Sequence, residues 1–194
     1  PDYEPPPEYS IASQASAKGV SPEELAYDFL LKDEGKGILY RPLSNYSYGN
    51  LDSVSDMLEN PGTIIGLGDG GAHVGILSDA SAITYMLTHW TRDRTRGRKF
   101  SVPWAIKRLT SDNANALGLT DRGLLKVGKK ADINIINYEQ LRINYPEVRY
   151  DLPAGGRRMV QTIDGYDATI LSGEIVRHMG QSTLNLPGRL VKSS

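Results

Sequence analysis

The segment Thr63–Gly75, TIIGLGDGGAHVG, decides how the rest of the chain is interpreted. A short run of β-branched apolar residues leads into glycines that flank Asp69 and precede His73. Residues 66–71 fit G-x-G-x-x-G, the pattern of loops that cradle a dinucleotide pyrophosphate. The same residues also fit a strand that ends in a carboxylate, which is where catalytic groups of parallel α/β folds lie.

The dinucleotide interpretation makes two demands that the sequence does not meet. The glycines should open a helix at once, and a second strand should end in an acidic residue about 20 positions later. Here Gly75 falls where the first helical turn should be, and residues 88–90 have the pattern of a helix end. Two interpretations stay open: a tight turn in which Asp69 caps the next segment, and a catalytic Asp69 at the end of a barrel strand.

Composition narrows the classes of protein. The chain has 194 residues, 39% of them apolar, a net charge of −1 and no cysteine. This length suits one ordinary domain or two small ones, and the missing cysteines exclude disulfides and thiolate metal sites. No apolar run approaches the roughly 20 residues of a membrane helix. We expect a cytoplasmic protein with neither nucleic acid nor membrane as partner.

One local exception to the neutral charge is the basic run Arg92–Lys99, which contains Asp93. It lacks the interleaved aromatic residues and the basic surroundings of a nucleic-acid surface. The run therefore predicts a solvated loop. An alternative is that one of its arginines holds a substrate carboxylate as a bidentate partner.

The first 120 residues have the pattern of an α/β fold. Ser21-Pro22 followed by Glu24 is a strong helix start. Helices are predicted over residues 21–35, 50–59, 81–90, 101–109 and 113–117, and strands over 38–40 and 63–67, the second strand being buried on both sides.

The pattern changes to short strands after residue 120. Strands are predicted over residues 132–136, 160–163, 169–171 and 175–178, and residues 137–158 are predicted to be an ordered loop. Residues 172–174 suit a hairpin turn. We place a boundary near residue 120.

Four segments resemble one family: GLGDGGAHVG (66–75), SDASAITYMLTHWTRDR (78–94), GLTDRGLLKVGKKADINIIN (118–137) and YDLPAGGRRMVQ (150–161). In this order and spacing they are similar to the C-terminal part of the N-acyl-D-amino-acid deacylases, or D-aminoacylases, of the amidohydrolase superfamily. The resemblance runs from about Tyr3 to the C-terminus.

This resemblance implies a fold and a reaction. Residues 1–119 would be the C-terminal portion of a TIM-type (β/α)8 barrel, and residues 120–194 the C-terminal portion of a small β-sandwich. Zinc would lie at the barrel mouth, and Asp69 matches the aspartate that ends the last strand. Asp69 would be a metal ligand and would pass a proton from the metal-bound water to the departing amine. The substrate would be an N-acyl-D-amino acid, and His73 would contact it or order the Asp69 loop.

The resemblance also implies that part of the site lies outside this chain. The only histidines are His73, His89 and His178, and none forms the His-x-His pair of the superfamily. A full barrel takes about 250 residues. We expect the remaining ligands in a missing N-terminal part of the same protein, and no activity from this chain alone. His89, next to Trp90, is predicted to be a core residue, and His178 to be structural.

Substrate specificity is left open by one departure from the family pattern. Some D-aminoacylases carry a Pro-His-Pro-Arg-like run after the aspartate, whose arginine holds the substrate carboxylate, and this chain has Leu77-Ser78-Asp79-Ala80 there. Two alternatives to a deacylase therefore remain. One is another amidohydrolase that acts on a cyclic amide or a dipeptide, and the other is a non-catalytic module.

Overall fold

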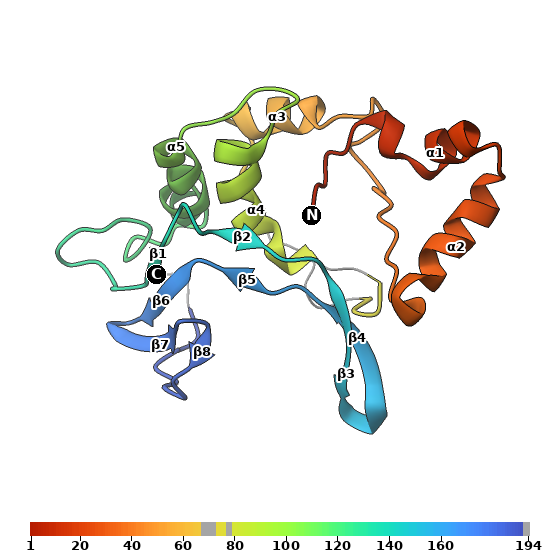
Figure 1. Cartoon of the computed structure of the whole chain (residues 1–194). Coiled ribbons are helices and arrows are strands. Elements are labelled where there is room, and N and C mark those ends of the chain that lie inside the picture. Colours follow the sequence, from red (N-terminus) through yellow and green to blue (C-terminus); the bar gives the residue numbers. More distant parts are fainter. Residues whose placement is uncertain (67–72, 77–78, 192–194) are drawn as a thin grey trace.

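The computed structural model describes residues 1–66, 73–76 and 79–191, and it places helices and sheets in separate regions (Figure 1). The helices are α1 (Ile11–Lys18), α2 (Pro22–Gly35), α3 (Asp52–Glu59), α4 (Ala82–Thr88), α5 (Val102–Lys107) and α6 (Asn113–Ala116). Short 3-10 turns cover Pro7–Tyr9, Asp79–Ser81 and Pro153–Gly155, and π-helical turns extend α4 over His89–Asp93 and α5 over Arg108–Asp112. The mixed α/β class is confirmed.

The predicted helix starts are confirmed at the atomic level. The Ser21 hydroxyl accepts a hydrogen bond from the Glu24 amide at 3.0 Å, and the Ser101 hydroxyl accepts one from the Trp104 amide at 3.3 Å. A proline follows each serine within the first turn. Because proline has no N–H to lose at this position, each Ser-Pro pair favours a helix start.

The two strands predicted before residue 120 are wrong over their described residues. Residues 38–40 and 63–66 carry no strand, and Leu67 lies outside the described residues. Side chains satisfy the carbonyls that a neighbouring strand would use. Arg108 donates to the Thr63 carbonyl at 2.7 Å, and Asn113 donates to the Ile65 carbonyl at 2.9 Å.

Among the described residues, all strands follow residue 130, and every strand pair is antiparallel. They are β1 (Ile133–Ile136), β2 (Arg142–Ile143), β3 (Glu147–Leu152), β4 (Gly156–Val160), β5 (Ile163–Asp164), β6 (Tyr166–Leu171), β7 (Glu174–His178) and β8 (Gln181–Ser182). They form a sheet in the order β1-β6-β7-β8 and the two-stranded pairs β2-β5 and β3-β4. The prediction of a loop over 137–158 is wrong, because this segment contains β2, β3 and the start of β4.

The predicted turn between β6 and β7 is confirmed. Ser172 and Gly173 have φ angles of 51° and 86°, the left-handed pair that a tight hairpin turn requires. The register pairs Leu171 with Glu174 and Ala168 with His178, with one irregularity between Thr169 and Ile170.

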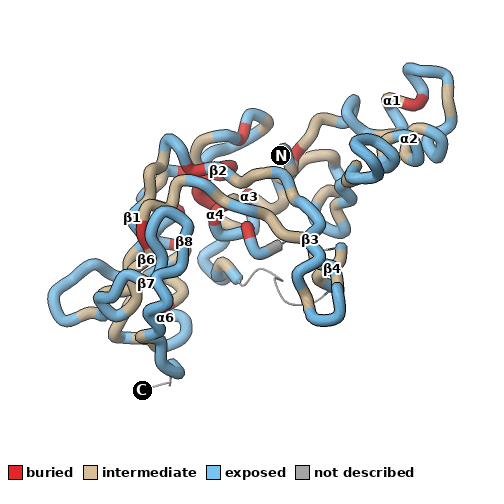
Figure 2. Tube along the Cα trace, turned by 60° about the horizontal axis from the view of Figure 1, so that its bottom comes forward, coloured by how far each residue is buried: buried red, intermediate tan, exposed pale blue. Residues whose placement is uncertain are grey.

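One hydrophobic core joins the helical part to the β part. Its buried members are Met86, Leu87, Trp90, Phe100, Ala105 and Leu141. Leu141 comes from the segment before β2, so residues on both sides of position 120 share this core. Buried positions concentrate there and are sparse elsewhere (Figure 2). The barrel stays a prediction, since no parallel strand pair is present among the described residues. The sandwich and the boundary near residue 120 also stay predictions.

Candidate functional site

Asp69, the residue predicted to be catalytic and to bind the metal, lies outside the described residues. His73 follows that segment and is exposed, with a φ angle of 51°. Its carbonyl accepts a hydrogen bond from the Ile76 amide at 2.9 Å, which closes a tight turn. The next carbonyl, of Val74, accepts one from the Met159 amide of β4 at 2.6 Å. The roles of Asp69 and His73 stay predictions.

The best-defined polar cluster in the described chain surrounds Arg94. Its guanidinium donates to both carboxylate oxygens of Glu4 at 2.9 Å and to Asp52 at 2.6 Å. Glu4 also accepts from the Leu51 amide at 2.7 Å, and its Oε2 lies 2.9 Å from His89 Nε2. The side chains of Arg94 and Glu4 are 0% and 2% exposed, so this is a buried, charge-assisted network.

Aromatic rings enclose the same cluster. His89 stacks on Tyr85 with ring centroids 4.5 Å apart, and Trp90 meets His89 edge-on. The Arg94 guanidinium lies 4.8 Å from the centre of the Trp90 ring, within range of a cation–π interaction. His89 is therefore a satisfied core histidine, as the sequence predicts.

Burial and charge determine the protonation of the cluster. Burial lowers the pKa of His89 below its usual 6.5, and the hydrogen bond with Glu4 only partly opposes this. Burial alone would raise the pKa of Glu4, but the hydrogen bonds from Arg94 and Leu51 outweigh it and the net shift is downward from 4.5. At neutral pH the cluster holds a neutral His89 between an ionised Glu4 and the aromatic rings.

Two neighbouring arginines also bind distant segments. Arg92 donates to the carbonyl oxygens of Tyr138 and Leu141, the second at 2.7 Å. Arg96 donates to the main-chain carbonyl of Glu4 at 3.2 Å. Arg92 thus ties the end of the α4 extension to the β part, and Arg96 ties the following loop to the N-terminal segment.

The prediction of a solvated loop over Arg92–Lys99 is therefore wrong for three of its four arginines. Arg94 is buried and Arg92 and Arg96 are half-buried, whereas Arg98 and Lys99 are exposed. The carboxylates that Arg94 binds belong to this chain. The signal in the sequence was an arginine at every second position. It does not indicate the partners of Arg94, because Glu4 and Asp52 lie 90 and 42 residues before it in the chain.

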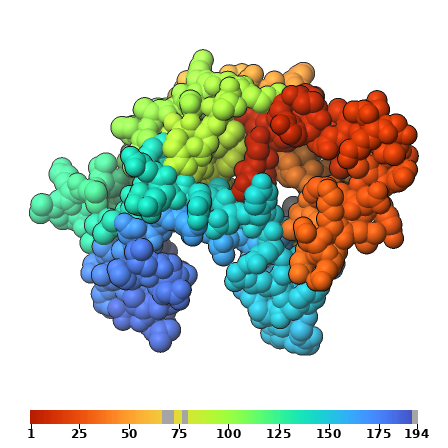
Figure 3. All heavy atoms as spheres, viewed as in Figure 1, coloured from red at the N-terminus to blue at the C-terminus, as the bar shows by residue number. Residues whose placement is uncertain are grey.

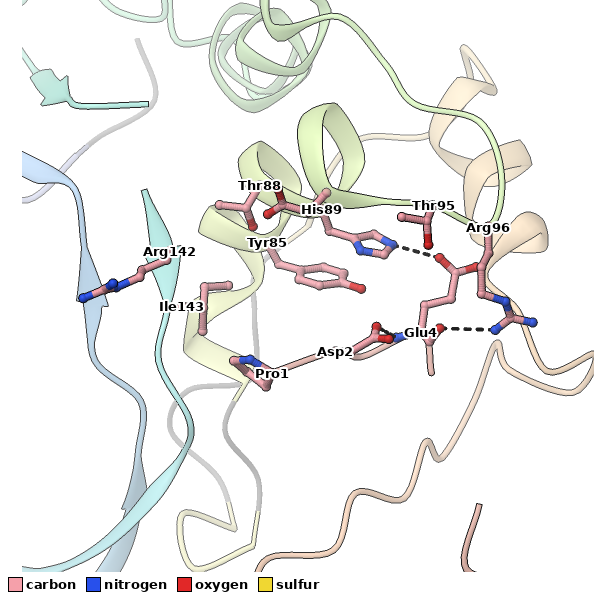
Figure 4. A pocket seen from close by; sticks show the side chains of 11 residues that line it. Pro1, Asp2, Glu4, Tyr85, Thr88, His89, Thr95, Arg96, Arg142 and Ile143 are labelled. Carbon is pink, nitrogen blue, oxygen red and sulfur yellow. Dashed lines mark hydrogen bonds and ion pairs between the residues drawn. The ribbon is translucent and has the colours of Figure 1, made fainter. Parts of the chain in front are cut away.

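A cavity of about 360 Å³ lies beside this cluster (Figure 4). Its lining includes Asp2, Glu4, Tyr85, His89, Arg96 and Arg142. Both oxygens of the Glu4 carboxylate are occupied by Arg94, so Glu4 is not a free base facing the cavity. The cluster holds the N-terminal segment against α4. Glu4 and His89 do not form a catalytic pair, because the Glu4 carboxylate is already bound by Arg94.

The described residues do not by themselves fit a metal ion, since no group of three His, Asp or Glu side chains among them could hold one. His178 ends β7 and is exposed, and it forms no metal-binding group with other described residues. Ligands for a metal would have to include residues outside the described part.

Comparison with known proteins places the chain in a family. The sequence pattern of the Amidohydrolase family matches residues 7–177. This chain belongs to the amidohydrolase family. The family is one of hydrolases, and the matched range includes the Asp69 segment.

Two curated relatives of this amidohydrolase chain are deaminases. The chain is 30% identical over 160 residues to a 5-methylthioadenosine/S-adenosylhomocysteine deaminase of Carboxydothermus hydrogenoformans, covering 79% of this chain and 35% of the relative. It is 30% identical over 162 residues to a protein of the same name from Pelotomaculum thermopropionicum, covering 81% and 35%. The chain thus spans about a third of the length of these relatives.

Two further findings complete the comparison. No solved structure matches this amidohydrolase chain significantly. Across the described ranges, no helix has the length and apolar character needed to span a bilayer.

Proposed function

We propose that the protein containing this chain is a metal-dependent amidohydrolase that cleaves N-acyl-D-amino acids into a carboxylic acid and a free D-amino acid. The observation that carries the proposal is Asp69 in GLGDGGAHVG, inside the segment that matches the amidohydrolase family. The metal, zinc in this proposal, would be held largely by residues beyond this chain. When bound, such an ion activates water and polarises a carbonyl.

In this proposal Asp69 moves the proton. An amine is a poor leaving group unless it is protonated, so a carboxylate that accepts a proton from water and delivers it to the nitrogen suits amide hydrolysis. Asp69 is flanked by glycines in the sequence, and residues without side chains would leave space for a substrate there. His73, four residues later, is exposed and is proposed to contact the substrate.

A second candidate is hydrolytic deamination of a purine nucleoside such as 5-methylthioadenosine. It is supported by the names of the two relatives, each 30% identical over about four fifths of this chain. Deamination also breaks a C–N bond with water, and the departing ammonia needs a proton as an amine does. Asp69 would have the same role in both reactions.

Substrate assays on the full-length, zinc-loaded protein separate the two candidates. One set measures the primary amine released from N-acetyl-D-amino acids, with the N-acetyl-L-amino acids as matched controls. The other measures ammonia released from 5-methylthioadenosine. We expect amine release from the D-series alone. Ammonia release without amine release would favour the deaminase, and a folded, zinc-loaded protein inactive on both would contradict both candidates.

A further inference from the structure

The β3–β4 hairpin projects from the rest of the molecule as an isolated two-stranded unit (Figures 1 and 3). Residues 147–151 of β3 are all exposed. Val148 is 43% exposed and Tyr150 is 70% exposed. A two-stranded hairpin is at best marginally stable in water, because it cannot bury either face on its own. The described residues leave residues 147–151 of this hairpin uncovered.

The two edges of the hairpin differ. The outer edge of β4 is tied at its base by the Met159 amide, which donates to the Val74 carbonyl. The outer edge of β3 has no such contact: no main-chain hydrogen bond joins residues 147–151 to any described residue outside β4. A free edge of this kind presents unpaired N–H and C=O groups to another strand.

The charges on β3 select the strand that would fit this edge. Glu147 and Arg149 flank Val148, and Arg149 Nε already donates to Glu147 Oε1 at 2.8 Å. In an antiparallel pair of two β3 strands centred on Val148, each Glu147 lies opposite the Arg149 of the other copy. The segment Glu-Val-Arg is thus complementary to itself across a two-fold axis, as an isologous dimer interface requires.

Other registers fit less well. Centring the pair on Arg149 puts arginine against arginine and Glu147 against Asp151, which are like charges. Centring it on Tyr150 uses Asp151, but both oxygens of that carboxylate accept from Arg158 at 2.7 Å. The ladder is also irregular between Arg149 and Leu152, so this end of the strand is not flat.

We propose that the free edge of β3 is a dimer interface at which a second copy of this chain pairs antiparallel, with Val148 on the two-fold axis. The two hairpins then form a four-stranded sheet in the order β4-β3-β3-β4. The four charges of Glu147 and Arg149 close into a network across the axis. The alternating signs allow this register and oppose a slip by two residues, which centres the pair on Arg149, so the same charges give specificity.

A charge exchange in the full-length protein tests the interface. We expect the wild type to be a dimer by light scattering, and Glu147→Arg or Arg149→Glu to raise the dimer dissociation constant about tenfold or more, because each places like charges together twice. The double variant Glu147→Arg/Arg149→Glu restores the pairing and the dimer. Arg142→Glu is the matched control, since it breaks an exposed ion pair with Asp164 on another sheet and leaves the dimer intact.

A cross-linking experiment tests the register. Val148→Cys, in a background without other cysteines, places two thiols directly opposite each other, where Cα atoms are roughly 4.5–5.5 Å apart and a disulfide forms readily. Tyr150→Cys is the control, because its two copies lie four residues apart along the pair, roughly 13 Å. We expect disulfide-linked dimers for the first variant alone. A monomeric wild type, a dimer that survives both single charge reversals, or cross-linking through position 150 in place of 148 would overturn the proposal.

Discussion

Arg94 brings a full positive charge into the interior, where its side chain is 0% exposed. Three groups neutralise and hold it: both oxygens of Glu4, the Asp52 carboxylate and the face of Trp90. Removing one partner of such a pair is costly because the remaining charge stays buried without compensation. The cluster therefore determines how firmly the N-terminal segment is attached to α4.

Arg94→Met is expected to lower the free energy of unfolding by about 3–5 kcal/mol, since it leaves the Glu4 carboxylate buried and unpaired. The double variant Glu4→Gln/Arg94→Met should recover part of this loss, because it removes both charges. Urea unfolding of the full-length protein measures each value. Arg142→Met is the control and should cost no more than about 1 kcal/mol, as expected for an exposed ion pair. Equal effects of Arg94→Met and Arg142→Met would contradict the role of the buried cluster.

The lowered pKa of His89 predicts a pH dependence of stability. The unfolded chain binds a proton at His89 as the pH falls through 6.5, whereas the folded protein does so only at lower pH. The free energy of unfolding is therefore undiminished by His89 above pH 6.5, and it decreases as the pH falls from 6.5 toward the pKa of His89 in the folded protein. Glu4, whose pKa is also lowered, adds a second loss only below about pH 4.5.

His89→Gln should therefore flatten the stability profile between pH 6.5 and 4.5. The amide of glutamine can still donate to Glu4 but does not titrate. The measurement is the urea midpoint at half-unit pH steps for the wild type and the variant. A variant profile as steep as that of the wild type in this window would show that another group is responsible.

At the scale of elements, the link between β5 and β6 packs closely against the main chain of Leu141. Gly165 has a φ angle of 98°, and its carbonyl accepts from the Asn137 amide at 2.8 Å. A Cβ atom there would lie 2.5 Å from the Cα of Leu141, a buried core residue. The main chain of the β part thus rests directly on the segment that enters the shared core.

Gly165→Ala is expected to destabilise the protein more than Gly173→Ala, although both residues have positive φ angles. Gly173 in the β6–β7 turn has φ 86° and open space around it, so alanine there pays only the conformational cost of roughly 1–2 kcal/mol. At position 165 the clash with backbone adds about 1–3 kcal/mol. Thermal or urea unfolding of the two variants makes the comparison, and equal losses would show that Leu141 can move aside.

The elements also show what sequence patterns can and cannot predict. Helix starts at Ser21 and Ser101 were predictable because serine, proline and the capped amides lie within four residues of each other. The strands expected over 38–40 and 63–67 require a neighbouring strand, which no local pattern supplies. β3 was missed although Glu147–Leu152 alternates polar with apolar or aromatic residues, because this short alternation lies between Pro146 and Pro153 in a long polar segment that has the composition of a loop.

Across the whole molecule, the amidohydrolase match covers residues 7–177, and the chain spans 35% of the length of its curated relatives. The family was accessible from sequence through the Asp69 segment. The buried ion cluster was not, because its members come from three distant segments that only the folded chain brings together. The specificity for N-acyl-D-amino acids remains a proposal to be decided by the substrate assays.

The most direct test of the central claim is the turnover of the full-length, zinc-loaded protein carrying Asp69→Asn. This change keeps the shape of the side chain and removes the group proposed to move the proton, so we expect turnover to fall by at least about 100-fold with an unchanged unfolding temperature. Asp28→Asn, at an exposed aspartate of α2, is the matched control and should retain wild-type turnover. Near-normal turnover in the Asp69→Asn protein would contradict the assignment of Asp69 as the catalytic carboxylate.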